Sequence, residues 1–426
     1  MNLTDKAWEK LFDRYEILKH IQSKGIFEIE AKRIREVREP RLMAKFDHYS
    51  NLPSLFKEHN LSILPISRSS YIIGQFEVYE KVRYNASLKP IQVDFPQEIT
   101  TIDPANLYSE SSALHCAHVT GMIDDILGEN SYQTISGRMS SKEFDFSINT
   151  KNGMDRIINI KNSQVEVDGG YESASKFMIV EAKNEKVDDF LVRQLFYPYR
   201  LWKDKTCKEI KPVFFTYSND IFSFFIYEFS DPKSYNSLRL KEQKDYIIAH
   251  EDIKFEDLID LLETPVVKEP FVPFPQADSF PRIVDLLGLL MENDLTAEQI
   301  TRNYNFDERQ TSYYTSAGIY LGLIEKGSTG DERGTQYRLS SKAKKMMKQS
   351  TKRKFLFLAS QILAHDVFRQ TFLEYVKNGY VPEKDRIVDI MMDCNLYNVS
   401  SYSTYRRRAS TVSSWINWIF NLPSTY

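Results

Sequence analysis

Residues 165–183 read VEVDGGYESASKFMIVEAK, and this stretch holds the most informative pattern in the chain. Two short runs of β-type residues, at 164–168 and 177–181, are separated by a polar connection that opens with Gly169-Gly170. Glycine pairs between such runs mark turns. The stretch therefore predicts a β-hairpin with an acidic residue at the end of each strand.

The charged residues of this hairpin are placed to act together. Side chains alternate across a strand, so Glu181 and Lys183 point to one face and Ala182 to the other. Asp168 ends the first strand and is expected to meet both. Two carboxylates can bind a hard divalent cation, and a lysine beside them can orient or help to deprotonate a water that attacks a phosphodiester. A solvated strand end is the commoner reading of a Glu-x-Lys triplet, so the flanking elements have to decide.

Composition bounds the class of protein. With 426 residues, 42% hydrophobic and 27% charged, the chain resembles a globular protein of two or three domains. No apolar run approaches the roughly 20 residues that span a membrane, and the first ten residues, MNLTDKAWEK, lack the apolar region of a signal peptide. Cys116, Cys207 and Cys394 are too far apart in sequence for a metal-type cluster. We expect a reduced, cytoplasmic protein without a membrane segment.

Charge is distributed unevenly along the chain. Residues 333–426 contain 16 Lys and Arg against 6 Asp and Glu, a net +10; because the whole chain carries −3, residues 1–332 carry −13. A basic C-terminal quarter on an acidic body is typical of a nucleic-acid-binding arm attached to a metal-using domain. A solvated lysine-rich face is the alternative interpretation.

Further elements are expected on both sides of the hairpin in a definite order. A helix is predicted at 108–127, strands at 143–148 and 156–160, a helix at 188–202, and an aromatic-rich hairpin at 212–229. The hairpin with Asp168 and Glu181 therefore lies between two helices along the chain.

Polar residues in the flanking segments are candidates for the same site. Glu110 begins a face of small residues on the first helix, where it can point to a metal site or can be a first-turn acid favoured by the helix dipole. Gln194 lies on the packed face of the second helix, where it can hydrogen-bond near the site or can be a core-edge amide satisfied by backbone. Arg41, Lys45 and Arg68 can contact phosphate, but surface solubility explains them equally well.

A proline-rich segment divides the chain. Residues 264–281 contain five prolines and predict a stiff, extended linker. Before it we expect an N-terminal α/β region at 1–100 that can contact DNA, and a domain at 101–263 that carries the acidic hairpin. After it we expect a winged helix-turn-helix domain at 282–350 and a second helical or winged-helix-like DNA-binding domain at 351–426.

Two C-terminal helices are expected to present DNA-reading side chains. In the helix before the predicted wing, the residues left outside the packed face are Arg309, Ser312, Tyr313, Ser316 and Tyr320. In the last helix, predicted at 401–420, the corresponding face carries Thr404, Arg407, Arg408, Thr411 and Ser414. Arginine and hydroxyl side chains suit base edges and phosphates. A protein–protein docking surface is the alternative for both helices.

With these residues assembled, the chain resembles prokaryotic type II restriction endonucleases of the PD-(D/E)xK superfamily with winged-helix modules at the C-terminus. The resemblance is carried by VEVDGGYE with IVEAKN, and by EPRLMAKFD, ILPISRSSYIIG, SESSALHCAHVTG, RQLFYPYRLW, DERQTSYYTSAGIYLGLIEK and YRRRASTVSSWINWI. The first catalytic element is Val167-Asp168 rather than Pro-Asp. The implied fold is mixed α/β (α+β): a nuclease core at 101–263, built as a mixed sheet flanked by helices, followed by winged-helix and helical DNA-binding domains.

The resemblance also implies a function. It implies Mg2+-dependent cleavage of double-stranded DNA at a short defined sequence, leaving 5′-phosphate and 3′-hydroxyl ends. It implies a DNA methyltransferase as a functional, not physical, partner that protects the host's own sites. Asp168 and Glu181 would bind the metal, the Ala182 carbonyl would complete the shell, and Lys183 would position the water. The secondary candidates are Glu110 as a metal ligand, Gln194 as a catalytic residue, and Glu166 and Glu172 as substitute ligands.

Other functions stay open on the sequence alone. A DNA-binding regulator with an inactive nuclease-like core would carry the same arm. A nuclease that cuts only modified DNA, or a repair nuclease that selects structure over sequence, would carry the same core. Stoichiometry is open as well: a palindromic site calls for a homodimer with one metal centre on each strand, whereas two tandem reading modules let a monomer recognise an asymmetric site.

Overall fold

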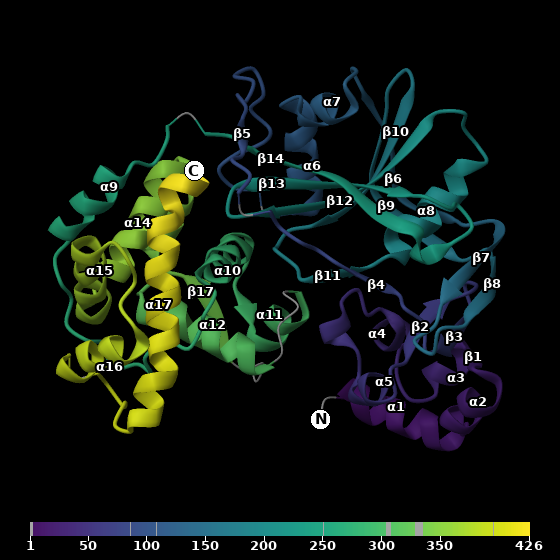
Figure 1. The fold of residues 1–426 in the computed structure, drawn as a ribbon, viewed down its shortest axis with the longest axis horizontal. Coiled ribbons are helices and arrows are strands. Elements are labelled where there is room, and N and C mark those ends of the chain that lie inside the picture. Colours follow the sequence, from purple (N-terminus) through teal and green to yellow (C-terminus); the bar gives the residue numbers. More distant parts are fainter. Residues whose placement is uncertain are drawn as a thin grey trace.

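The computed structural model describes residues 3–85, 87–107, 109–249, 251–303, 308–328, 335–394 and 396–426. Figure 1 shows three parts: an N-terminal unit (residues 3–74) at lower right, a seven-stranded sheet above it, and a C-terminal unit (residues 280–426) at left. The fold is mixed α/β, as expected. Tyr108, Tyr304 and residues 329–334, which belong to expected elements, lie outside the described residues. None of the described helices is long and apolar enough to cross a membrane.

The N-terminal unit packs short helices around a small antiparallel sheet. The strands, in spatial order, are β1 (Ile26–Glu30), β3 (Ser70–Gly74) and β2 (Ser62–Pro65). The helices are α1 (Leu3–Arg14), α2 (Ile17–Lys24), α3 (Ala31–Arg35), α4 (Pro40–Ala44) and α5 (Ser54–Glu58). Trp8, Phe12 and Phe56 form the aromatic centre of its core, with edge-to-face ring contacts.

The central sheet has the order β5-β14-β13-β12-β10-β9-β6. The pairs β10–β12 and β14–β5 are parallel, and the other neighbours are antiparallel. The strands are β5 (Ile91–Gln92), β6 (Tyr132–Ser140), β9 (Gln164–Glu172), β10 (Lys176–Lys183), β12 (Glu209–Ser218), β13 (Ile221–Phe229) and β14 (Leu238–Ile247). The hairpin expected at 212–229 is confirmed as β12–β13. The sequence patterns did not predict β6 or β14.

Helices cover both faces of this sheet. On one face, α8 (Arg193–Lys203) contributes Leu195 and Phe196 to a buried cluster with Phe214. On the other face, α6 (Glu110–Val119) and α7 (Met122–Leu127) bury Leu114 in a cluster with Val180. Because β10 is buried on both sides, its apolar run is continuous rather than alternating.

The acidic hairpin forms, but its glycines serve a different purpose from the one expected. Gly169 and Gly170 lie inside β9, and the turn is at 173–175. A Cβ on Gly169 would lie 2.8 Å from the Tyr171 ring, and one on Gly170 would lie 2.9 Å from Ile135. The two glycines are therefore required by close packing of neighbouring side chains rather than by a turn.

Two expected helices are shorter than predicted. The helix expected at 108–127 breaks at Gly121, whose φ of +78° separates α6 from α7. The helix expected at 188–202 begins at Arg193, because β11 (Asp189–Leu191) pairs with β4 (Tyr79–Lys81). The strands expected at 143–148 and 156–160 are confirmed as the hairpin β7 (Glu143–Asn149) and β8 (Asp155–Lys161).

The C-terminal unit begins with the elements expected for the domain at 282–350. These are α10 (Phe280–Glu292), β15 (Leu295–Thr296), α11 (Ala297–Asn303), α12 (Glu308–Tyr320), the antiparallel pair β16 (Ile324–Ser328) and β17 (Thr335–Leu339), and α13 (Ser341–Met347). The helices α14 (Thr351–Leu363), α15 (Asp366–Asn378), α16 (Lys384–Asp393) and α17 (Tyr402–Thr425) follow. Residues 351–394 and 396–426 contain helices and no strand, so a second winged helix is not formed there.

One buried core joins the whole C-terminal unit, and the proline-rich segment packs against it. The core includes Phe280 on α10 and Tyr426 at the C-terminus, and it extends to Ile221 of β13 and Ile247 of β14. Residues 264–281 are extended but docked: Phe274 is buried and stacks on Phe368, and the Trp415 indole donates a hydrogen bond to the Ala277 carbonyl at 2.8 Å. The segment therefore holds the C-terminal unit in place rather than acting as a free spacer. It follows α9 (Phe255–Asp260), and short 3-10 turns lie at Tyr49–Asn51, Tyr235–Ser237 and Leu261–Glu263.

Candidate active site

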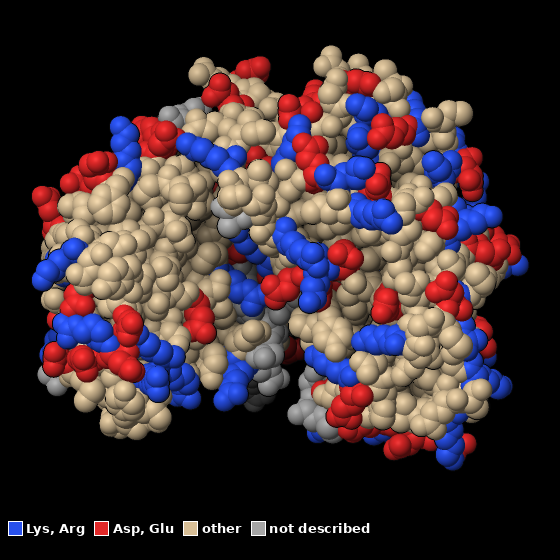
Figure 2. Space-filling view, in the orientation of Figure 1, with Lys and Arg blue, Asp and Glu red and all other residues tan. Residues whose placement is uncertain are grey.

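A cleft of about 1650 Å³ lies where the three parts of the molecule meet. Its lining includes Arg41 and Lys45 from the N-terminal unit, Lys183 from the sheet, and Asp285 and Arg309 from the C-terminal unit. Figure 2 shows the hollow between the left and right halves of the molecule, with Lys and Arg side chains along its edges. The acidic hairpin of the sheet forms part of its wall.

The Asp168 side chain is aimed into this cleft by a β-bulge. The register of β9 against β6 shifts between the pairs Ile135–Gly170 and Gly137–Val167, so two residues of β9, Asp168 and Gly169, lie opposite one residue of β6. Bulges bend a strand and redirect side chains, and they are common beside active sites. The Asp168 carboxylate accepts a hydrogen bond from the Ala182 N–H at 2.8 Å, which ties the middle of β9 to the end of β10. Asp168 therefore does not end its strand, as the sequence predicted, because β9 continues through the two glycines.

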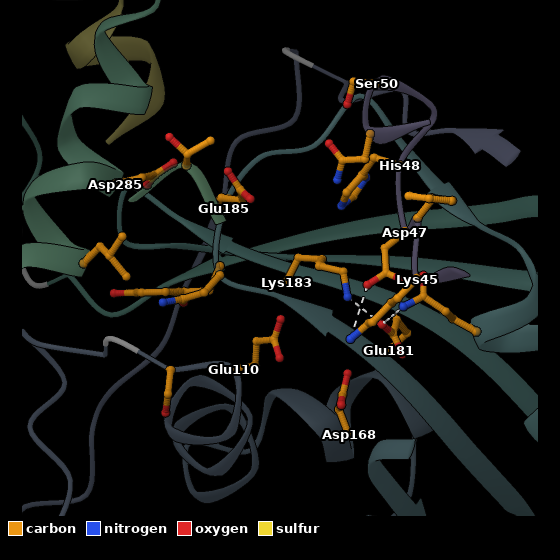
Figure 3. A pocket seen from close by; sticks show the side chains of 18 of the residues that line it. Lys45, Asp47, His48, Ser50, Glu110, Asp168, Glu181, Lys183, Glu185 and Asp285 are labelled. Carbon is orange, nitrogen blue, oxygen red and sulfur yellow. Dashed lines mark hydrogen bonds and ion pairs between the residues drawn. The ribbon is translucent and has the colours of Figure 1, made fainter. Parts of the chain in front are cut away.

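Figure 3 shows Asp168, Glu181 and Lys183 lying close together, and hydrogen bonds join Lys183 and Gln194 to Glu181. Lys183 Nζ donates to Glu181 Oε1 at 2.5 Å and to the Ala182 carbonyl at 3.0 Å. Gln194 Nε2, from the first turn of α8, donates to the same Glu181 oxygen. The side chains of Glu181 and Lys183 are only 7% and 13% exposed. The interpretation of Gln194 as a residue of the site, rather than a core-edge amide, is the one that matches these contacts.

Burial disfavours the ionised form of the acidic groups in this cluster. Burial raises the pKa of Glu181 to about 7, although the nearby Lys183 charge opposes the shift. Burial also raises the pKa of Asp168, again against the pull of Lys183. For Lys183, burial disfavours the ammonium, but the carboxylates of Glu181, Glu110 and Asp47 outweigh burial and raise its pKa. A compact set of buried acids with one cation is a marker of a functional site.

Glu110 lies at the edge of this cluster. It is the first residue of α6, which begins with a capping box formed by Ser109 and Ser112. Burial raises the pKa of Glu110, and the charge of Lys183 is the strongest influence in the opposite direction. In Figure 3 its carboxylate points toward Lys183. The helix therefore places Glu110 at the cleft, where it faces the lysine.

Three family matches cover most of the chain, and each family is described only as a domain of unknown function. Residues 5–73 match DUF6996, residues 74–247 match DUF6997, and residues 282–424 match DUF7226. No curated protein and no solved structure matches the chain. These boundaries follow the three parts of the fold, so the cleft is lined by all three matched regions.

The N-terminal unit supplies residues that sequence patterns did not single out. Asp47 and His48 line the cleft beside Lys45. Burial opposes charge on Asp47, but Lys183, Lys45 and Arg193 outweigh it and lower the Asp47 pKa. His48 is buried, and its Nδ1 lies 2.6 Å from the Asp189 carbonyl. The sequence signals were their position directly after the basic segment that contains Lys45 and, for Asp47, its place at the end of the segment EPRLMAKFD.

The C-terminal unit closes the opposite wall. Arg309, at the start of α12, lines the cleft, as does Asp285 of α10. Glu185, two residues beyond Lys183, is 9% exposed, and its Oε2 accepts no hydrogen bond within the described part of the chain. Burial and the nearby charge of Asp285 raise the pKa of Glu185 to about 8, against the pull of Arg282. Sequence patterns missed Glu185 and Asp285.

The helix α12 presents most of the side chains expected of it. Arg309 and Ser312 are exposed, and Tyr313 and Ser316 are half-buried. The Arg309 guanidinium lies 5.9 Å from the centre of the Tyr313 ring. Tyr320 is the exception: it is 2% exposed, and its hydroxyl donates to Glu269 of the proline-rich segment at 2.9 Å. The docked segment, which helical periodicity could not reveal, turns this end of the helix into core.

The helix α17 differs more from what the sequence predicted, because two of its expected DNA-contacting residues are buried. Arg407 is exposed and Thr404 is half-buried, but Arg408 and Thr411 are 8% and 1% exposed, so neither offers a free face to DNA. Thr411 donates to the Asp278 carboxylate at 2.9 Å, and Ser414 donates to the Asp278 carbonyl. Burial and the charge of Arg407 lower the pKa of Arg408 to about 10. The face taken as solvent-exposed packs against the proline-rich segment and the body of the unit.

The two substitute ligands named from the sequence, Glu166 and Glu172, are each paired with a basic residue. Glu166 forms an ion pair with Arg138 of β6 at 3.0 Å, and Glu172 forms one with Lys208 at 2.6 Å. Glu172 is the last residue of β9 and does not belong to the turn that follows it. Within the described chain, no three His, Cys, Asp or Glu side chains are gathered closely enough to hold a metal ion between them. A cation at this edge of the sheet would therefore use two carboxylates with a backbone carbonyl, and Glu110 does not complete a three-carboxylate group.

Proposed function

We propose that this protein is a Mg2+-dependent endonuclease that hydrolyses phosphodiester bonds of double-stranded DNA at a defined sequence. The observation that carries the proposal is the convergence of Asp168, Glu181 and Lys183 at the wall of the cleft. In this proposal the sheet with α6 and α8 is a PD-(D/E)xK core. Three helices followed by the β16–β17 hairpin are a winged helix.

The residues at the edge of β10 fit a divalent cation. Glu181 is buried and Asp168 is half-buried. The surroundings disfavour the charge of both carboxylates, and a cation would compensate that cost. Both carboxylates and the Ala182 carbonyl offer oxygen, which Mg2+ prefers. These three groups would hold the ion, with water filling the other positions. A bound Mg2+ would supply charge stabilisation at the scissile phosphate and lower the pKa of an attacking water.

The chain's own residues would do the remaining work. Lys183, with its ammonium held charged by surrounding carboxylates, would orient the water and neutralise charge on the phosphate. Gln194 would keep the Glu181 carboxylate in one orientation, since it donates to Oε1. The water oxygen bonds to phosphorus and releases a proton to solvent, the bond from phosphorus to the 3′ oxygen breaks, and that oxygen takes a proton from solvent. The products are a 5′-phosphate and a 3′-hydroxyl.

The walls of the cleft suit a duplex. Exposed Arg41 and Lys45 lie on one wall and Arg309 on the other, where cationic side chains can contact the two DNA backbones. The helix α12 would read base edges with Arg309, Ser312, Tyr313 and Ser316. A site-specific nuclease endangers its own host, so the proposal also includes a DNA methyltransferase as the functional partner.

The test is cleavage of unmethylated plasmid and phage DNA with Mg2+. We expect a fixed ladder of fragments, and we expect Lys183→Ala to lower the cleavage rate at least about 100-fold, the size of effect seen when a positioned acid–base or electrostatic group is removed. Lys161→Ala is the matched control, because Lys161 is 68% exposed on β8. Sequencing the fragment ends reports the site, the cut position and its symmetry.

Other outcomes assign other functions. Plasmid that is retarded but uncut by the wild type indicates the DNA-binding regulator with an inactive core. Cleavage restricted to methylated DNA indicates a modification-dependent nuclease, and cleavage restricted to branched or damaged DNA indicates a repair nuclease. Equal cleavage by wild type and Lys183→Ala would overturn the assignment of the active site.

A further inference from the structure

The N-terminal unit brings an additional carboxylate to the cluster and fixes it there. Asp47 follows α4, and its backbone carbonyl accepts a hydrogen bond from Leu191 N at 3.0 Å. The neighbouring Phe46 carbonyl accepts from the Tyr79 hydroxyl at 2.8 Å. Both contacts tie residues 46–47 to the β4–β11 pair, which leads directly into α8. Figure 3 shows Asp47 approaching Glu181 and Lys183 from the side opposite Asp168.

One carboxylate oxygen of Asp47 has no hydrogen-bond partner among the described residues. Its Oδ2 lies 3.5 Å from Lys45 Nζ, while Oδ1 is buried and accepts no hydrogen bond from any described residue. The side chain is only 18% exposed. A buried acceptor without a partner is costly and calls for an explanation. Among the charges that act on Asp47, that of Lys183 is the strongest.

Lys183, in contrast, is engaged with the groups that a cation would need. Its ammonium donates to Glu181 Oε1 and to the Ala182 carbonyl, and both groups are assigned above to Mg2+. A bound cation and the ammonium therefore compete for the same oxygens. When the cation binds, the ammonium has to move to another anionic acceptor, because a buried charge without a partner is unfavourable.

We propose that Asp47 is this acceptor: a positioning residue of the N-terminal unit that receives the Lys183 ammonium when Glu181 and Ala182 turn to the cation. The inference rests on the proposed nuclease function and deepens it. The active site is then shared between the region 5–73, which supplies Asp47, and the region 74–247, which supplies Asp168, Glu181 and Lys183. The N-terminal unit is part of the catalytic machinery and not only a DNA-contacting module.

The test is a double-mutant cycle on Mg2+ binding, measured by calorimetric titration of the full-length protein. We expect Asp47→Asn to weaken Mg2+ binding about tenfold, because the ammonium stays on Glu181. In the Lys183→Ala background the competing ammonium is absent, so Asp47→Asn should change the affinity by less than about twofold. A purely long-range effect of the Asp47 charge would instead weaken binding equally in both backgrounds, and that result overturns the proposal.

Controls separate this role from a structural one. Asp13→Asn removes a charge from an exposed position on α1 of the same unit and should leave Mg2+ affinity unchanged. Thermal unfolding of each variant shows whether it is folded. Asp47→Glu keeps the carboxylate and should therefore bind Mg2+ more tightly than Asp47→Asn. Asp47→Asn with wild-type Mg2+ affinity overturns the proposal.

The kinetics of DNA cleavage give a second test, which is independent of the Mg2+-binding measurement. We expect Asp47→Asn to lower kcat on cognate DNA about tenfold with KM unchanged within about twofold, since the residue acts on Lys183 and not on DNA binding. A change confined to KM overturns the proposed role. If the wild type binds Mg2+ without cutting DNA, the nuclease function fails and the Mg2+ cycle still decides the role of Asp47. If the wild type does not bind Mg2+, both proposals fall.

Discussion

Glu181 and Glu185 lie four residues apart at the end of one strand and differ sharply in their surroundings. Glu181 accepts hydrogen bonds from Lys183 and Gln194. Glu185 is equally buried, but its Oε2 accepts none within the described chain, and Asp285 adds a second negative charge nearby. The alternation of side chains along β10 predicted the pairing of Glu181 with Lys183. The surroundings of Glu185 depend instead on α10, which lies about 100 residues later in the sequence.

Glu185→Gln should change stability in a pH-dependent way. The folded-state pKa is about 8 against an ordinary 4.5, so the folded protein holds a proton that the unfolded chain releases between these values. The contribution of Glu185 to stability is therefore lost as pH rises through this window. We expect Glu185→Gln to be close to neutral at pH 4 and to stabilise the protein by about 1–3 kcal/mol at pH 9. Urea unfolding at several pH values measures this, and a pH-independent difference would contradict it.

At the scale of elements, α12 and α17 show how far periodicity carries. On α12 the residues between those predicted to lie outside, such as Tyr314 and Ala317, are buried. On α17 the apolar stripe was also correct, with Val412 and Ile416 fully buried. The prediction that the opposite face of α17 is exposed was wrong at Thr411 and Ser414, because both donate hydrogen bonds to Asp278 of the proline-rich segment. Periodicity predicts which face of a helix is packed but cannot show that a second face is packed as well.

These two helices should respond differently to mutation. We expect Arg309→Ala to weaken binding of cognate DNA by about 1–3 kcal/mol and to reduce its salt dependence, since Arg309 is exposed at the cleft. We expect Thr411→Ala to leave DNA affinity unchanged and to cost about 1 kcal/mol of stability through the lost bond to Asp278. Fluorescence anisotropy in Mg2+-free buffer and urea unfolding measure the two effects. If Thr411→Ala weakens DNA binding and Arg309→Ala does not, α17 is the reading helix instead of α12.

At the scale of the whole molecule, the tip of the β12–β13 hairpin attaches the C-terminal unit to the sheet. Asp220 at this tip accepts from Lys354 at 2.5 Å and from Thr351 at 2.9 Å, and the Lys354 side chain is 2% exposed. The adjacent Ser218 and Asn219 bond to Asp285 of α10. The cluster of Asp168, Glu181 and Lys183 and the proposed reading helix therefore hold a fixed relation to each other.

Breaking this attachment should affect both stability and cleavage. Asp220→Ala leaves the Lys354 ammonium buried without its carboxylate, which costs about 3–5 kcal/mol. We expect a lower Tm by differential scanning calorimetry and slower cleavage at the cognate site, because α12 no longer holds the DNA in register with Asp168 and Glu181. Lys352→Ala, at a more exposed pair with Asp257, should have a much smaller effect. Equal effects of the two substitutions would argue against a special role for the hairpin tip.

The sequence by itself determined many of the elements and the local part of the site. Alternation placed Glu181 with Lys183, helical spacing placed Gln194 on the packed face of its helix, and aromatic-rich runs predicted the β12–β13 hairpin, because each of these patterns depends on neighbours within a few residues. Tertiary structure alone decided which residues from distant segments join them. Asp47 and Asp285 meet the cluster only through the packing of three units around one cleft. The proline-rich segment covers α17 for the same reason. Burial and long-range pairing set those contacts, and no local period in the sequence records them.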